Sequence, residues 1–160
     1  MKERGLIRVL VIDYSAFSRR TITRMLETSP LVKVVGSARD GEEALQKVFK
    51  IKPDLITLDL DMPRMNGFTF LRLVMAKMPT PVMVISGRTG EDEVFRALDL
   101  GAVDFIGKPT PRPTPELETI QQEVIRKVHA IRQLRIDKVK QRVDRPAEMT
   151  IPAHVSMTQP

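Results

Sequence analysis

Four polar residues follow apolar segments of the chain and carry groups that could act together. They are Asp13, Asp59, Ser86 and Lys108, which supply two carboxylates, a hydroxyl and an ammonium group. Each has an ordinary explanation when taken alone, because strands often stop at a polar residue and a single lysine near a strand end is usually solvated. Taken together, their types fit one reaction, the transfer of a phosphoryl group onto a carboxylate.

That reaction brings negative charge against negative charge, so the site has to supply cations. Magnesium held by carboxylate and carbonyl oxygens is the usual means. A lysine can place a point charge at a phosphoryl oxygen, and a hydroxyl can donate a hydrogen bond. Crowded carboxylates without a cation would repel each other, and one would tend to keep its proton.

The elements that must position these residues alternate along the chain. The apolar stretches expected as strands are residues 6–12, 32–36, 54–59, 81–86 and 102–106. The stretches expected as helices are residues 15–27, a segment opened by an Asp40–Glu43 capping pattern, residues 66–78, residues 91–100 before Gly101, and a segment from Thr114 to about Val139. Near-continuous apolar strands alternating with amphipathic helices indicate an α/β fold, with a parallel sheet covered by helices on both faces. The carboxyl ends of parallel strands share one edge, so we expect the four polar residues to meet there.

The last expected helix is long for a single domain, and its apolar spacing persists toward Val139. The remaining residues contain prolines and show no periodicity, which is typical of a flexible tail or linker. We therefore expect one domain over residues 5–127 and an extension over residues 128–160, whose helical part could serve as a linker or as a homodimer contact.

The composition excludes several classes of function. The chain has no cysteine, so disulfides and thiolate metal sites are excluded and a cytoplasmic location is favoured. No apolar run approaches the length of a membrane span, and the first residues are too short and too charged for a signal peptide. The net charge of +6 is spread evenly and aromatic residues make up only 4%, so we expect no nucleic-acid partner.

Four segments, RVLVIDYS, DLITLDLDMPRMNG, PVMVISG and GAVDFIGKPT, resemble the receiver domains of bacterial response regulators in their order and spacing. Within that family, SARDGEEAL, PTPVMVIS and GAVDFIGKPT look most similar to the amino-terminal receiver of chemotaxis methylesterase regulators of the CheB type. The resemblance implies a flavodoxin-like, doubly wound sheet of strand order 2-1-3-4-5. The chain contains no G-x-S-x-G element of an esterase, so we expect a signalling domain and not an enzyme.

The resemblance also implies roles for individual residues. Asp59 would be the phosphoacceptor, and Ser86 and Lys108 would hold the phosphoryl oxygens. Ser86 and Phe105 would form a switch, although Phe105 could equally be a permanently buried core ring. The phosphodonor would be a histidine kinase of a chemotaxis phosphorelay, and the output would pass to an effector domain or a partner protein.

One position departs from the family pattern. Magnesium would be held by Asp13, Asp59 and the backbone carbonyl of Asp61, but the second acid of the usual pair is replaced by Tyr14. A phenol is neutral near pH 7 and a poor magnesium ligand, so the metal should bind weakly or not at all. Asp13 could shift to compensate, the side chain of Asp61 could contribute, or the Tyr14 ring could cover the pocket mouth.

Three functions follow from these observations. The first is a phosphoacceptor signalling domain. The second is a degenerate pseudo-receiver, a protein-interaction module that works without phosphorylation because of Tyr14. The third is a phosphatase with Asp59 as nucleophile and Asp61 as general acid. It is disfavoured because the D-x-D motif of that class follows the first strand, whereas here it follows the third.

Overall fold

A computed structural model describes residues 5–108 and 115–144 of the chain, with the side chains of the last helix described over residues 118–134. Within these residues, five strands alternate with five helices. The strands are β1 (Ile7–Ile12), β2 (Val32–Ala38), β3 (Leu55–Leu58), β4 (Val82–Ser86) and β5 (Asp104–Gly107). The helices are α1 (Ala16–Leu26), α2 (Gly41–Ile51), α3 (Gly67–Lys77), α4 (Glu91–Asp99) and α5 (Pro115–Asp144).

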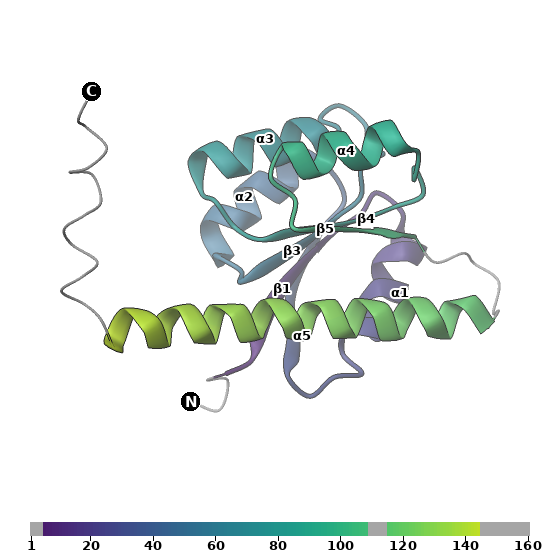
Figure 1. Ribbon diagram of the computed structural model, residues 1–160. Coiled ribbons are helices and arrows are strands. Elements are labelled where there is room, and N and C mark those ends of the chain that lie inside the picture. The colour runs from purple at the N-terminus through teal and green to yellow at the C-terminus, as the bar shows by residue number, and fades with distance from the viewer. Residues whose placement is uncertain (1–4, 109–114, 145–160) are drawn as a thin grey trace, which may run out of the picture. The chain divides into compact units, whose positions relative to one another are not determined.

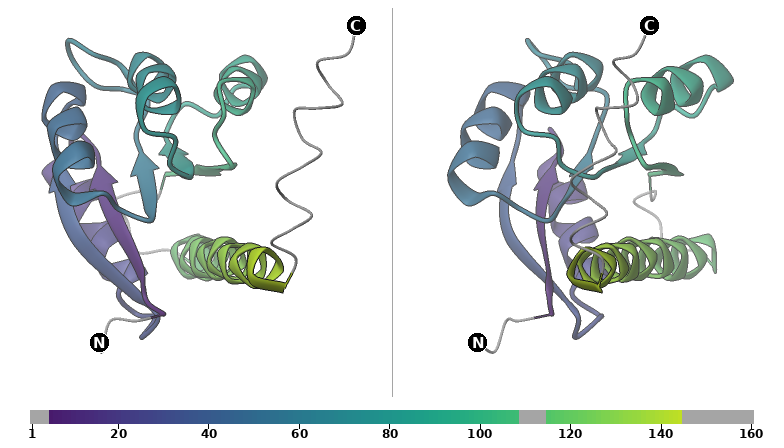
Figure 2. Two further views of the ribbon diagram at one scale, coloured as in Figure 1. Left: turned by 90° about the vertical axis from the view of Figure 1, so that its left-hand side faces the viewer. Right: turned by 60° about the vertical axis from the view of Figure 1, so that its left-hand side comes forward.

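The sheet is parallel throughout and has the strand order β2-β1-β3-β4-β5, which confirms the predicted fold class and topology. Helices α2, α3 and α4 lie together on one face of the sheet, and α1 lies on the opposite face (Figures 1 and 2). The chain divides into two compact units between Ile125 and Arg126, inside α5. No helix in the described residues is both long enough and apolar enough to cross a membrane.

The central strands explain the continuous apolar runs in the sequence. Every residue of β3 and β4 is buried, as expected for strands covered on both faces. The side chain of Phe70 on α3 is also fully buried in the core cluster. Burial of one such side chain is worth about 1.5–3 kcal/mol, so a stabilising core lies beneath the residues at the strand ends.

Helix termini are set by local hydrogen bonds that the sequence signals. Ser15, Asp40 and Asn66 each cap a helix by accepting a hydrogen bond from the backbone N–H three residues later. Gly101, with a φ of 116°, ends α4 as predicted.

Three predicted boundaries differ from the structure by two residues or more. Strand β2 ends at Ala38 and not at residue 36. The last strand starts at Asp104 and not at residue 102, because the N–H of Ala102 closes α4 by donating to the carbonyl of Ala97 at 3.0 Å. Helix α5 extends to Asp144, beyond the predicted end near Val139.

Candidate functional site

The register of the central strands places the two aspartates beside each other. Ile12 of β1 is paired with Leu58 of β3, so Asp13 and Asp59 both follow the last paired residues of neighbouring strands. The N–H of Asp59 donates to the carbonyl of Ile12 at 3.0 Å, which continues the ladder to the edge of the sheet. The side chains of Asp13 and Asp59 therefore emerge together at the carboxyl end of the strands.

The serine and the lysine reach the same edge through the other pair of strands. Ser86 of β4 is paired with Gly107 of β5, and the N–H of Lys108 donates to the carbonyl of Ser86 at 3.0 Å. The Lys108 Nζ lies 3.0 Å from Asp13 Oδ2, 3.1 Å from Asp13 Oδ1 and 3.4 Å from Asp59 Oδ2. One ammonium group thus joins carboxylates that are 46 residues apart in the sequence.

Burial of these charged side chains changes the protonation behaviour of Asp59. The side chain of Asp13 is fully buried, that of Asp59 is 3% exposed and that of Lys108 is 20% exposed. Burial, together with the negative charge of Asp13, raises the pKa of Asp59 to about 6, although Lys108 and the N–H of Asp61 act in the opposite direction. At neutral pH Asp59 is therefore mostly ionised and available as a nucleophile. Its ionised form is nevertheless less stable than that of an exposed aspartate.

A close backbone approach shapes the loop after Asp59. The N–H of Gly67 donates to the carbonyl of Leu60 at 3.0 Å. A Cβ atom at Gly67 would lie 2.6 Å from the Cα of Leu60 and 2.7 Å from the carbonyl oxygen of Asp59. The first residue of α3 therefore has to be glycine for the loop to fold back against the end of β3.

The oxygen atoms at the site suit magnesium in kind, because two buried carboxylates and a neighbouring backbone carbonyl are the donors that this ion prefers. Asp13 Oδ2 accepts no hydrogen bond, although the Lys108 ammonium lies within ion-pair distance, so this oxygen has a lone pair left for a cation. Among the described residues, however, no group of three His, Cys, Asp or Glu side chains converges to hold a metal ion.

Tyr14, which stands where the family pattern has a second acid, points its side chain into solvent. The Tyr14 side chain is 58% exposed, so the ring does not fill the pocket in place of an ion. Its backbone carbonyl accepts a hydrogen bond of 3.2 Å from Arg19 Nη1, which also donates to the carbonyl of Asp13 at 2.8 Å. Arg19 thereby fixes the loop that carries Asp13, and the acid missing at position 14 is not replaced from this loop.

The two residues predicted to form a switch lie on adjacent strands. Ser86 is fully buried, and its Oγ accepts a hydrogen bond of 3.1 Å from the N–H of Arg88. Phe105 is partly buried and packs against the main core cluster. It is therefore neither a deeply buried core ring nor a fully solvated one.

Several interactions at the site have no counterpart in the sequence reasoning. Arg88 Nη1 lies 2.9 Å from Asp61 Oδ1, and Arg88 Nη2 lies 3.6 Å from Glu93 Oε2. Arg64 Nη2 forms a 3.0 Å ion pair with Asp40, the cap of α2, and so attaches the loop after β3 to that helix. Hydropathy periodicity does not identify such pairs. The only signal for Arg88 is its position two residues after Ser86, where the serine hydroxyl can accept its N–H.

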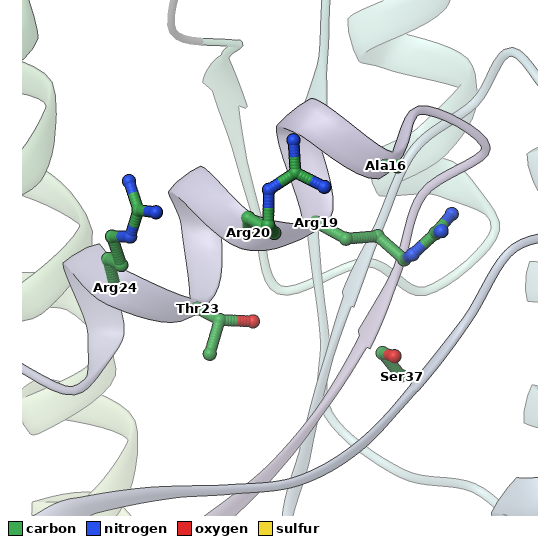
Figure 3. Close-up of a pocket in the computed structure, with 6 residues that line it drawn as sticks. All are labelled: Ala16, Arg19, Arg20, Thr23, Arg24 and Ser37. Carbon is green, nitrogen blue, oxygen red and sulfur yellow. The ribbon is translucent and has the colours of Figure 1, made fainter.

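A separate cavity of about 320 Å³ lies beside α1 and β2 (Figure 3). Its lining residues are Ala16, Arg19, Arg20, Thr23, Arg24 and Ser37. Figure 3 shows Arg19 extending away from Arg20 and Arg24, so the guanidinium groups do not converge on one point. None of the four polar residues at the carboxyl edge of the sheet lines this cavity.

In sequence and in structure, the chain is similar to known response regulators. The family model of the response regulator receiver domain matches residues 9–120. Protein-glutamate methylesterase/protein-glutamine glutaminase 3 of Geobacter sulfurreducens is 54% identical over 85% of this chain and 37% of its own length. The corresponding protein 1 of Myxococcus xanthus is 52% identical over 84% of this chain and 39% of its length. The chain thus spans less than two fifths of each of these relatives.

Solved structures agree with the sequence comparison. The response regulator domain of Thermotoga maritima CheB has a TM-score of 0.73 and 40% identity, covering 80% of this chain and 97% of that one. The CheX–CheY–BeF3–Mg2+ complex from Borrelia burgdorferi matches with a TM-score of 0.68 and 30% identity, covering 82% and 98% of the two chains. From the matched family model, the shared topology and the similarity to a CheB receiver, the chain belongs to the response regulator receiver domain family.

Proposed function

We propose that this chain is a phosphoacceptor receiver of a chemotaxis phosphorelay, in which Asp59 accepts a phosphoryl group from a histidine kinase. The observation that carries the proposal is the position of Lys108, whose Nζ lies 3.4 Å from Asp59 Oδ2 and 3.0 Å from Asp13 Oδ2 in a buried pocket. A phosphoryl group on Asp59 would find a cation already in place. An ordinary ion pair joins one exposed acid to one exposed base. Burying two carboxylates beside a single lysine is costly for stability, which favours a functional role for the arrangement.

The transfer itself is a simple displacement at phosphorus. A carboxylate oxygen of Asp59 forms a bond to the phosphorus atom, and the bond between phosphorus and the histidine nitrogen of the donor breaks. The electron pair of the broken bond stays on the imidazole nitrogen, and the product is an acyl phosphate on Asp59. Lys108 compensates the charge of the phosphoryl oxygens as they approach, and Ser86 can donate its hydroxyl to one of them.

Asp13, Asp59 and the backbone carbonyl of Asp61 are the residues that would hold Mg2+. When bound, this ion supplies positive charge that offsets the repulsion between a carboxylate and a phosphoryl group. The relative from Borrelia burgdorferi was solved with BeF3 and Mg2+, which supports the same requirement here. The substitution at Tyr14 removes one direct carboxylate, so we expect weaker binding of the ion than in a site with the usual acidic pair.

The switch would begin at Ser86. Its Oγ now accepts the N–H of Arg88, and turning toward a phosphoryl oxygen would break that 3.1 Å hydrogen bond and release the loop before α4. The partly buried Phe105 on the neighbouring strand could then move inward. The changed surface would be recognised by an effector, either a domain of the same polypeptide or a separate protein.

The setting follows from the relatives. Their names describe methylesterases and glutaminases, so we propose a CheB-type regulator in the cytoplasm whose effector is an esterase unit. The receiver would end near residue 127, and the helical part of residues 128–160 would act as a linker or as a homodimer contact. The receiver would not itself be an enzyme, and no nucleic-acid partner is proposed.

Intact mass measurement tests the central step. The chain is incubated with MgCl2 and acetyl phosphate, and a mass increase of one phosphoryl group is expected. The adduct should be absent in Asp59→Asn and present in Asp99→Asn, a control at an exposed aspartate on α4. An adduct that persists in Asp59→Asn, or its absence from the unsubstituted chain at high magnesium, would refute the proposal.

The second candidate is the pseudo-receiver, and a specific observation favours it. Tyr14 is exposed, and no third acid converges on the site among the described residues. If the chain binds an effector equally well before and after treatment with acetyl phosphate, and carries no adduct, this reading replaces the first.

A further inference from the structure

The acidic pocket lacks one carboxylate of the usual pair, and a further aspartate lies close by. Asp61 follows Asp59 by two residues, and its N–H donates to Asp59 Oδ1 at 3.2 Å. Its backbone is therefore fixed beside Asp59, while its side chain is 57% exposed. The exposed phenol at Tyr14 cannot fill the same role.

The Asp61 carboxylate is held by an arginine that is itself attached to the site. Arg88 Nη1 lies 2.9 Å from Asp61 Oδ1, and the N–H of Arg88 donates to Ser86 Oγ. Arg88 also has a second acidic neighbour, since its Nη2 lies 3.6 Å from Glu93 Oε2. Both partners of the Arg88–Asp61 pair are about half exposed, and exposed ion pairs contribute little to stability. The pair can therefore open at little cost, and Glu93 can keep Arg88 neutralised.

From this arrangement we propose that the side chain of Asp61 serves as a divalent-cation ligand in place of the acid missing at Tyr14, and that Arg88 competes with the cation for it. The inference rests on the proposed function, because it concerns the cation that the phosphoacceptor site requires. Cation binding would transfer the Asp61 carboxylate from Arg88 to the metal ion, and Arg88 would move toward Glu93. The buried Asp13 Oδ2, which accepts no hydrogen bond but lies 3.0 Å from the Lys108 ammonium, would be a second ligand of the same ion.

The proposal is tested by magnesium binding to the full 160-residue chain, measured by isothermal titration calorimetry with MgCl2 and no phosphodonor. Asp61→Asn should weaken binding about tenfold or more, because it removes a direct ligand. Arg88→Gln should tighten binding about twofold to fivefold, because the competitor is lost. In the double variant, Arg88→Gln should have no effect, since Asp61 is no longer there to be released.

Arg64→Gln is the matched control. It removes the same charge from a nearby loop, but its guanidinium pairs with Asp40 and not with Asp61. Its magnesium affinity should equal that of the unsubstituted chain. Equal tightening in Arg64→Gln, or an Arg88→Gln effect that persists in the Asp61→Asn background, would show that Arg88 acts only through net charge and would overturn the proposal.

The remaining outcomes separate this inference from the proposed function. Unchanged affinity in Asp61→Asn, or no magnesium binding by any variant, overturns the assignment of Asp61. The phosphoryl adduct on Asp59 is measured by intact mass on separate portions of the same protein, incubated with MgCl2 and acetyl phosphate. If the adduct forms while Asp61→Asn leaves the affinity unchanged, only the assignment of Asp61 fails. If the cycle behaves as expected and no adduct forms, the ligand assignment stands and the phosphoacceptor function fails.

Discussion

Replacing Asp59 with asparagine should stabilise the fold near neutral pH. The Asp59 side chain is 3% exposed and lies beside the buried Asp13, and this environment raises its pKa to about 6 from the ordinary value of 3.8. The folded chain therefore binds a proton on Asp59 more tightly than the unfolded chain does. Stability from this group is fully present below pH 3.8 and is lost as the pH rises through 6. Asparagine has the shape of the protonated acid and carries no charge at any pH.

The size of the effect follows from the two pKa values. Their difference corresponds to about 3 kcal/mol at 1.4 kcal/mol for each factor of ten. Solvent screening at the pocket mouth reduces this figure, and the variant also loses the 3.4 Å contact between Asp59 and Lys108. We therefore expect Asp59→Asn to be more stable than the unsubstituted chain by about 1–2 kcal/mol above pH 7, and the difference to approach zero near pH 4.

Urea unfolding followed by far-ultraviolet circular dichroism measures this difference, because the chain has no tryptophan for fluorescence. Measurements at pH 4, 5.5 and 7.5 with EDTA present give the pH dependence without a bound cation. Asp99→Asn, at an exposed position on α4, should show no such trend. A variant less stable than the unsubstituted chain at pH 7.5, or a gain that does not change with pH, would refute the electrostatic reasoning.

Three further substitutions, one of them with a control variant, test the supports of the site by urea unfolding. Lys108→Met should lower the free energy of unfolding by about 3 kcal/mol at pH 7.5, because it leaves Asp13 and Asp59 buried without a cation. The loss should be smaller at pH 5, and an equal loss at both pH values would contradict this reasoning. Gly67→Ala should cost about 2 kcal/mol, because its Cβ would lie 2.6 Å from the Cα of Leu60; a neutral effect would show that the loop can yield. Asp40→Ala should cost about 1–2 kcal/mol, because it removes the cap of α2. Arg64→Ala, at a side chain 65% exposed, should cost much less than Asp40→Ala. Equal losses would show that Asp40 stabilises the fold through its ion pair with Arg64 and not by capping α2.

The strands and the approach of Asp13 to Asp59 could be predicted because both follow from simple periodic rules. Apolar runs without alternation indicate strands that are buried on both faces, and parallel strands end at one edge. The position of Ser86 and Lys108 follows in the same way from the pairing of β4 with β5. The prediction needs only the order of the segments and the rule that their carboxyl ends lie together.

The start of the last strand and the pairing of Arg88 with Asp61 could not be predicted in this way. Whether residues 102 and 103 continue a helix cap or open a strand depends on one hydrogen bond, from Ala102 to Ala97, that competes with the sheet. The direction of a long, exposed arginine side chain depends on several rotatable bonds and on weak interactions with Asp61 and Glu93. Periodicity in the sequence carries no information about either.

The charge balance of the pocket links its stability to its proposed chemistry. Asp13 and Asp59 bring two negative charges into the interior, and Lys108 brings one positive charge, so one negative charge remains without a partner when both acids are ionised. A second permanent cation would remove this imbalance, but it would also hold Asp59 in a closed ion pair and weaken it as a nucleophile. Because the outer arginine, Arg88, is instead paired with Asp61 and Glu93, the imbalance remains available to a divalent cation that binds reversibly. The negative charge of Asp59 therefore both lowers the stability of the fold and attracts a cation to the site. Asp59→Asn should raise the stability and weaken cation binding together.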